Sequence, residues 1–139
     1  MSDVHEIKIK KGHSDGTLTL SDGGSTRAKN KDLIIWTIKD GIEVTSIESI
    51  NKKSGTEIFK NPAYSNGTIW TAEIKDDLPD DCEYEYKIAW NGKFGHKETD
   101  PKISVNPTDD FMKVFIGLAV GLFVAILSLG FLSKERSKR

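Results

Sequence analysis

Short runs of apolar, β-branched and aromatic residues alternate with turn sequences over the first hundred residues. Several runs alternate apolar and polar positions with a period of two, as in Ile7/Ile9 and Tyr84/Tyr86/Ile88. This period is typical of strands that turn one face toward a core. The turns between them are rich in Gly, Asp, Asn and Ser. The expected strands cover residues 6–10, 17–20, 32–38, 44–50, 68–74, 83–90 and 102–105.

About seven short strands joined by regular turns predict a mainly β fold, a single antiparallel Greek-key β-sandwich. We expect this soluble domain to cover residues 1–108, which is enough chain for one core. Trp36, which ends the apolar run "DLIIW", is the aromatic residue that we expect inside that core.

A different pattern follows the predicted domain. Residues 114–132 contain no charged side chain, and a helix of that length spans roughly 28 Å, close to the hydrocarbon thickness of a bilayer. The sequence therefore predicts one transmembrane helix, preceded by a juxtamembrane linker over 109–113 and followed by a basic tail over 133–139.

Small residues recur every four positions within the predicted span, at Gly117, Gly121 and Ala125. This spacing places them on one helix face, where a second helix can approach closely. The partner would be another copy of the chain or a different membrane protein. The alternative interpretation is the ordinary glycine and alanine content of a membrane helix.

Two rules disagree about which side of the membrane the domain faces. The basic tail favours a cytoplasmic C-terminus and an extracytoplasmic domain. However, the N-terminal sequence "MSDVHEIKIKKG" has no apolar stretch of the kind that a signal peptide contains. We therefore favour a single-pass, tail-anchored protein with a cytoplasmic domain. The sequon at Asn66 is weak support for the extracytoplasmic alternative.

The charge distribution narrows the class of partner. Residues 1–110 carry 15 Lys and Arg against 20 Asp and Glu, and this acidic balance excludes a typical nucleic-acid-binding domain. With Cys82 as the single cysteine, neither an internal disulfide nor a cysteine-rich metal site can form. The acidic segment 73–85 suggests a weak calcium site, a docking surface for a basic partner, or simply a solvated loop.

The order of several segments resembles the cupredoxin-like sandwich over residues 5–106. These segments are "IKIKKGHSDGTLTL", "AKNKDLIIW" and "EYEYKIAW…DPKISVNP". A copper-binding member of that family would hold the metal with two His, a Cys and usually a Met. Here Cys82 precedes the tyrosine-bearing segment, and Met1 and Met112 lie outside the domain. The resemblance thus implies the fold without its metal centre, and we expect no metal and no cofactor.

Three aromatic residues are candidates for an exposed binding platform. Trp90 opens the loop "WNGKFGHKETD", Phe94 lies in the same loop, and Trp70 is the second tryptophan that need not be in the core. The segment "YEYK…NG" also resembles part of a starch- or glycogen-binding sandwich module, so a sugar is one candidate ligand and a peptide is another. The three histidines, His5, His13 and His96, are scattered and indicate solvated positions more than a metal site.

No arrangement of a nucleophile with a base, paired catalytic carboxylates or phosphate-binding glycines is evident in the sequence. The sequence therefore predicts a non-enzymatic, membrane-anchored interaction module. One alternative is a small membrane effector or complex subunit whose helix oligomerises under the control of a ligand-sensing domain. The other is a carbohydrate-binding module of the cell envelope.

Overall fold

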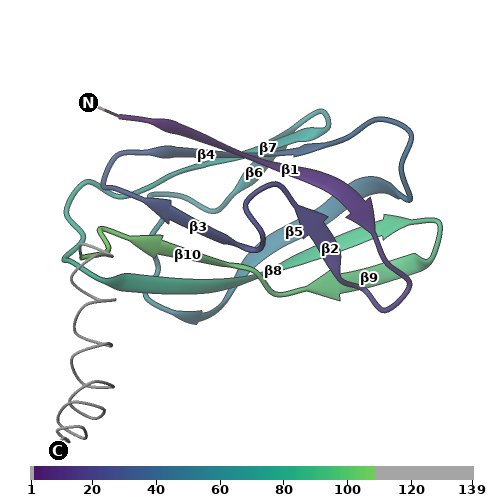
Figure 1. Ribbon diagram of the computed structural model, residues 1–139. Helices are drawn as coiled ribbons and strands as arrows, with labels where there is room; N and C mark the ends of the chain where they lie inside the picture. Colours follow the sequence, from purple (N-terminus) through teal and green to yellow (C-terminus); the bar gives the residue numbers. More distant parts are fainter. Residues whose placement is uncertain (1, 109–139) are drawn as a thin grey trace, which may run out of the picture. The chain divides into compact units, whose positions relative to one another are not determined.

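The computed structural model describes residues 2–108 and contains ten strands in that range (Figure 1). They form two sheets packed face to face, which confirms the mainly β, sandwich-like fold expected from the sequence. In chain order the strands are β1 (Val4–Gly12), β2 (Leu18–Leu20), β3 (Ser25–Ala28), β4 (Leu33–Ile38), β5 (Val44–Gly55), β6 (Tyr64–Asn66), β7 (Ile69–Glu73), β8 (Cys82–Gly92), β9 (Gly95–Thr99) and β10 (Lys102–Val105).

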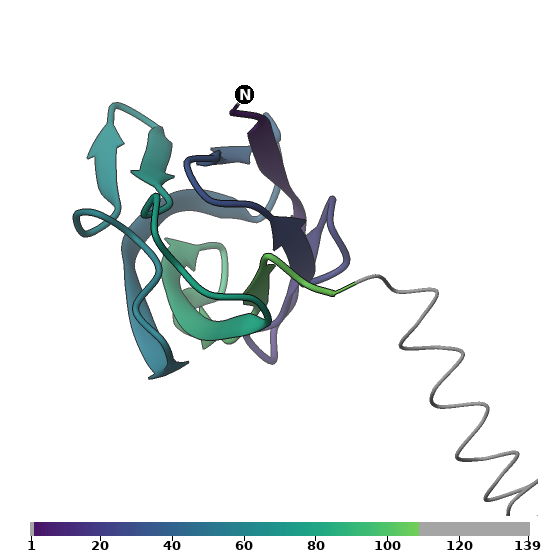
Figure 2. The same ribbon diagram turned by 90° about the vertical axis from the view of Figure 1, so that its left-hand side faces the viewer.

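The first sheet, which we call sheet A, has the strand order β2-β1-β4-β7-β6. The second, sheet B, has the order β3-β10-β8-β5, and β9 also pairs with β8. Figure 2 shows the two layers along the strands, with the long strands β5 and β8 curving around the core. Strand β4 is thus central in sheet A, and both of its edges are hydrogen-bonded to neighbours.

The prediction of purely antiparallel sheets is wrong, because each sheet contains one parallel pair. Strand β4 lies parallel to β1, and β3 lies parallel to β10. Parallel neighbours need a crossover connection. Here the chain leaves sheet A after β2, forms β3 in sheet B, and returns to sheet A as β4. Alternation of apolar and polar residues fixes which face is buried but carries no information on strand direction.

Interlocking aromatic rings fill the centre of the core between the sheets. Trp36 is fully buried, as expected, and its ring meets the rings of Phe59 and Tyr86 edge to face at 6.0 and 5.7 Å. The indole Nε1 of Trp36 donates a hydrogen bond of 3.1 Å to the Tyr86 hydroxyl. Burial raises the pKa of Tyr86, so this hydroxyl stays neutral and the pair joins sheet A to sheet B without a buried charge.

Among the described residues, the buried hydrophobic side chains all belong to residues 7–105, inside the predicted 1–108 domain. This part of the chain contains its own continuous core, and we therefore expect it to fold by itself. Within the described range there is no helix with the length and apolarity to cross a bilayer. The predicted linker 109–113, helix 114–132 and tail 133–139 lie outside the described residues.

Candidate functional site

Trp90 does not lie on the surface, which contradicts its expected place in an exposed platform. It is the third residue from the end of strand β8, which continues to Gly92, and its side chain is fully buried. Its Nε1 donates a hydrogen bond of 2.9 Å to the carbonyl oxygen of Gly16. The ring therefore closes the end of the core beneath the β1–β2 turn.

The other members of the predicted platform do not gather beside each other on one sheet. Trp70 belongs to β7 in sheet A, is half-buried, and is paired in register with Trp36. Phe94 is half-buried in the turn between β8 and β9 and packs against the core. The predicted helix-packing residues Gly117, Gly121 and Ala125 lie outside the described residues.

The outer side of sheet A has an unusual composition. Ile34 and Trp36 point from β4 into the core, so Leu33 and Ile35 point outward, where both are half-buried. A sheet with one solvated face normally places polar residues there. Strand β4 is therefore apolar on both sides. This pattern is typical of strands that are covered on both faces of their sheet. The uninterrupted run "LIIW" is the sequence signal for this surface.

Neighbouring strands extend this apolar surface. Val4 on β1 is paired with Leu33, and Thr71 on β7 is paired with both Ile35 and Tyr64. Continuing the β4–β7 register by one step places Thr37 beside Ile69. We call this surface the open face of sheet A, and its apolar and hydroxyl-bearing residues are Val4, Leu33, Ile35, Thr37, Tyr64, Ile69 and Thr71. Glu6 also faces outward here, beside Ile35, and its carboxylate accepts a hydrogen bond of 2.8 Å from the Thr37 hydroxyl.

The large hydrophobic side chains that are most exposed in the described range all belong to the open face. Val4 and Tyr64 are each 62% exposed, and Ile69 is 43% exposed. They come from three different strands, and only the strand pairing brings them together. They are therefore the large apolar side chains of the described range that are most available to a partner.

A hollow of about 180 Å³ lies at one side of the open face. Its wall contains Thr71, whose hydroxyl is buried and has no hydrogen-bond partner among the residues that the structure describes. Native proteins leave few such groups unpaired. The hydroxyl offers both a donor and an acceptor to a molecule on this face. The hollow is lined by Leu33, Asn61, Pro62, Tyr64, Thr71, Ala72 and Glu73.

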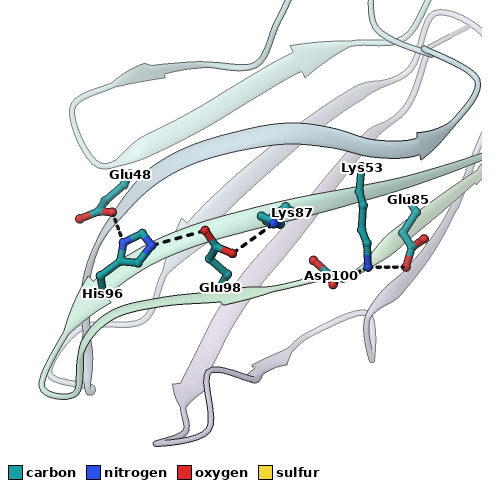
Figure 3. Close-up of polar contacts among 7 residues, drawn as sticks. All are labelled: Glu48, Lys53, Glu85, Lys87, His96, Glu98 and Asp100. Atoms are coloured by element: carbon teal, nitrogen blue, oxygen red, sulfur yellow. Dashed lines mark hydrogen bonds and ion pairs between the residues drawn. The ribbon is translucent and has the colours of Figure 1, made fainter.

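The outer side of sheet B has the opposite character. His96 Nδ1 lies 2.6 Å from Glu48, and its Nε2 lies 3.4 Å from Glu98, which also pairs with Lys87 at 3.1 Å (Figure 3). Further along the same side, Lys53 pairs with Asp100 at 2.9 Å and approaches Glu85 at 4.0 Å. We call this surface the charged face, and it consists of Glu48, Lys53, Glu85, Lys87, His96, Glu98 and Asp100.

These contacts shift protonation equilibria in a defined direction. The hydrogen bonds that His96 donates to Glu48 and, to a smaller extent, to Glu98 raise the pKa of His96 above its ordinary 6.5. Lys87, followed by His96, lowers the pKa of Glu98 below its ordinary 4.5. The stabilisation through His96 is thus complete below about pH 6.5 and is lost as the pH rises through its raised pKa. The stabilisation through Glu98 is present above about pH 4.5 and is lost as the pH falls through its lowered pKa.

We expect the pKa of His96, measured by NMR titration of the imidazole protons, to lie above 6.5 in the native domain. In the Glu48→Gln variant it should fall, because the shorter of the two contacts then involves a neutral amide. Glu98→Gln should lower it by a smaller amount, since that contact is longer. An unchanged His96 pKa in both variants would mean that the contacts of His96 with Glu48 and Glu98 do not form in solution.

A second hollow, of about 350 Å³, lies at the end of the sandwich where β1 begins and β10 ends. Asp32 on its wall is buried and accepts hydrogen bonds from the backbone amides of Asp3 and Lys29, both at 2.9 Å, and a contact of 2.8 Å from His5 Nε2. Burial raises the pKa of Asp32, but these hydrogen bonds outweigh it, so the net pKa is lowered. Asp32 therefore ties the start of β1 to the β3–β4 turn.

The histidines each have local polar partners. His5 contacts Asp32, His13 contacts the Thr19 hydroxyl at 2.8 Å, and His96 lies in the charged face. Among residues 2–108 no group of three or more His, Cys, Asp or Glu side chains is placed to hold a metal ion. The polar contacts of these residues are thus those of local structure.

No protein-family model matches this chain, and no curated protein matches it either. Among solved structures, it is similar to a cysteine protease inhibitor from Entamoeba histolytica, with 11% sequence identity. The similarity covers 76% of this chain and 96% of the inhibitor, with a TM-score of 0.36. A likeness at that level carries no conclusion about the fold or the function of the present chain.

Proposed function

We propose that this chain is a non-enzymatic interaction module, a β-sandwich without a metal centre that the hydrophobic segment 114–132 holds at a membrane. The observation that carries the proposal is the open face of sheet A. Leu33 and Ile35 of its central strand face away from the core, and the exposed hydrophobic side chains Val4, Tyr64 and Ile69 lie on the strands around that strand. Covering that surface with a partner removes apolar area from water at roughly 25 cal/mol per Å².

The two outer faces of the sandwich support different expectations. On the charged face most side chains already pair with one another, so a partner would have to break existing ion pairs to bind there. On the open face, by contrast, Val4, Tyr64 and Ile69 are exposed to water. The Thr71 hydroxyl has no hydrogen-bond partner among the described residues. We therefore place the binding surface on sheet A.

The carbohydrate-binding alternative loses support from the position of Trp90. Stacking of a sugar on an aromatic ring needs an exposed ring face, and this ring is fully buried. The effector alternative depends on residues 114–132, as does the membrane anchor itself. A tail-anchored topology with a cytoplasmic domain remains our proposal for the orientation, and the basic tail keeps the extracytoplasmic alternative open.

The proposal can be tested in cells by photocrosslinking of the full-length chain. A benzophenone amino acid at Thr37 lies on the open face, and the same residue at Lys87 lies on the charged face as the matched control. We expect crosslinked adducts from position 37 and few from position 87, because only the first surface is covered by a partner. The adducts should remain in the membrane pellet after alkaline carbonate extraction.

The two parts of the proposal fail separately in this experiment. Equal adduct yields from the two positions, or none from position 37, would contradict a binding role of the open face. Adducts that form but leave the pellet on carbonate extraction would contradict the membrane anchor and leave the binding surface in place.

A further inference from the structure

The open face has a charge pattern that fits a copy of itself, and we propose that its partner is a second copy of this chain, packed sheet A against sheet A. The inference rests on the proposed function, because it takes the open face as the binding surface and segment 114–132 as the anchor. It adds the identity of the partner, the geometry of the contact and the reason why the contact needs the membrane.

The strand register defines the corners of the open face. Val4, Leu33 and Glu73 lie side by side in one row of outward positions. Four residues further along the strands, Lys8 is paired with Thr37, and the extended register adds Ile69 to that row. Taken in order around the edge, the corners are Val4, Glu73, Ile69 and Lys8.

One diagonal of this arrangement is apolar and the other is charged. Val4 and Ile69 occupy opposite corners, and Lys8 and Glu73 occupy the remaining two. A two-fold axis along the apolar diagonal brings Val4 and Ile69 close to their own copies. The same operation brings Lys8 of each copy close to Glu73 of the other. The face is thus self-complementary, as the isologous interface of a symmetric dimer must be.

This symmetry also fixes how the two sheets cross. The Val4–Ile69 diagonal crosses two strand spacings over four residues and lies about 36° from the strands, so the strands of the two copies cross at about 70°, closer to the orthogonal class of sheet packing than to the aligned class. Ile35 and Thr71 lie near the centre, where the copies meet most closely. Glu73 already contacts Lys60 at 3.3 Å, and a carboxylate has acceptor sites for a second cation.

The charges favour a protein partner over the lipid surface. Two acidic residues, Glu6 and Glu73, and two basic residues, Lys8 and Lys60, lie at the rim of the open face. Their formal charges cancel. Attraction to anionic lipid needs an excess of Lys and Arg near the surface. A balanced rim with opposite charges at opposite corners gives no such attraction and favours a partner with the same pattern.

The area of the face explains why membrane attachment matters. Strand and residue spacings give a surface about 14 Å on each side, or roughly 200 Å². Stable complexes usually bury about 800 Å² per partner, so the domain alone should associate weakly. Five residues, 109–113, reach only about 17 Å from the predicted span. Anchoring would thus confine the copies to a thin layer beside one bilayer, which raises their local concentration and favours a weak contact.

The test uses disulfide crosslinking of the full-length chain in liposomes at a low ratio of protein to lipid, in a Cys82→Ser background. Ile69→Cys places a thiol near the two-fold axis, and Lys87→Cys places one on the charged face as the control. We expect Ile69→Cys to form covalent dimers and Lys87→Cys to form few. Charge reversal then supplies a second readout that depends on the proposed pairing.

Charge reversal is tested by adding either Lys8→Glu or Glu73→Lys to the Ile69→Cys chain. Each single change puts like charges at the two ends of the charged diagonal. Each should lower the dimer yield by about tenfold, because two ion pairs are replaced by two repulsions. The double reversal restores opposite charges and should restore the yield. The inference would be overturned if the single reversals left the dimer yield unchanged. It would also be overturned if the double variant stayed monomeric.

The remaining outcomes also decide the question. If Ile69→Cys is shielded from maleimide by liposomes without forming dimers, the face contacts lipid and the inference is wrong. If the chain fails to float with the liposomes, the anchor in the proposed function fails. In that case sedimentation of the 1–108 domain at millimolar concentration decides the inference: reversible dimers that Lys8→Glu abolishes support it, and a strict monomer overturns it.

Discussion

Replacing Trp90 by alanine is expected to lower the free energy of unfolding of the domain by about 4 kcal/mol, a large loss even among core substitutions. The side chain is fully buried, and its Nε1 is bonded to the Gly16 carbonyl oxygen. The ring also packs directly on the backbone, since a Cβ built at Gly12 would lie 2.9 Å from Trp90 Cη2. Removing it leaves a cavity that rigid neighbours cannot fill and an unpaired carbonyl group.

Urea unfolding of the 1–108 domain, followed by tryptophan fluorescence or circular dichroism, measures this loss. For a domain of this length each 1 kcal/mol corresponds to about 4–8 °C in Tm. Trp70→Ala is the matched control, and its loss should be smaller because Trp70 is only half-buried. A loss for Trp90→Ala no greater than that of Trp70→Ala would show that the ring is not part of the core. Reduced sugar binding by Trp90→Ala would therefore report unfolding and not a lost platform.

The position of Trp90 was available from the alternation of residues along β8. It has the same parity as Tyr84, Tyr86 and Ile88, which all point into the core. The pattern of turn residues instead predicts that the strand ends at residue 90, with Trp90 at the start of a loop. In the structure β8 continues to Gly92 and turns into β9, so the supposed loop is a hairpin.

Three strands were not predicted from the sequence, and they share one property. Strands β3, β6 and β9 contain three to five residues each and lie in segments rich in turn-forming residues. Their conformation comes from pairing with a longer neighbour: β3 with β10, β6 with β7, and β9 with β8. Local sequence carries little signal for a strand whose stability depends on a distant partner.

The same limit applies to the open face. The double-sided apolar character of β4 can be recognised in "LIIW", which suggests that a covered outer surface exists. That Val4, Tyr64 and Ile69 join this surface depends on three strand pairings among β1, β4, β6 and β7, and one of these pairings is parallel. The membrane helix and its small-residue face remain predictions from the sequence.

Gly92→Ala is expected to destabilise the domain by about 3 kcal/mol or more, although it adds a single methyl group. Gly92 ends β8 where the chain turns toward β9, and it lies against the start of β5. A Cβ at this position would come within 1.9 Å of the Glu43 carbonyl oxygen and 3.0 Å of the Val44 Cα. Both contacts involve backbone atoms, so no side-chain rotation can relieve them.

The clash also disrupts a hydrogen bond, because the Glu43 carbonyl oxygen accepts the amide of Lys93 at 2.8 Å. Gly67→Ala is the control: Gly67 has a φ of +74°, but no atom lies within 4 Å of an added Cβ. That change should cost only the left-handed backbone penalty of about 1–2 kcal/mol. Urea unfolding of both variants gives the comparison. If Gly92→Ala costs no more than Gly67→Ala, β5 and the β8–β9 turn are not in the close contact from which the larger loss is expected.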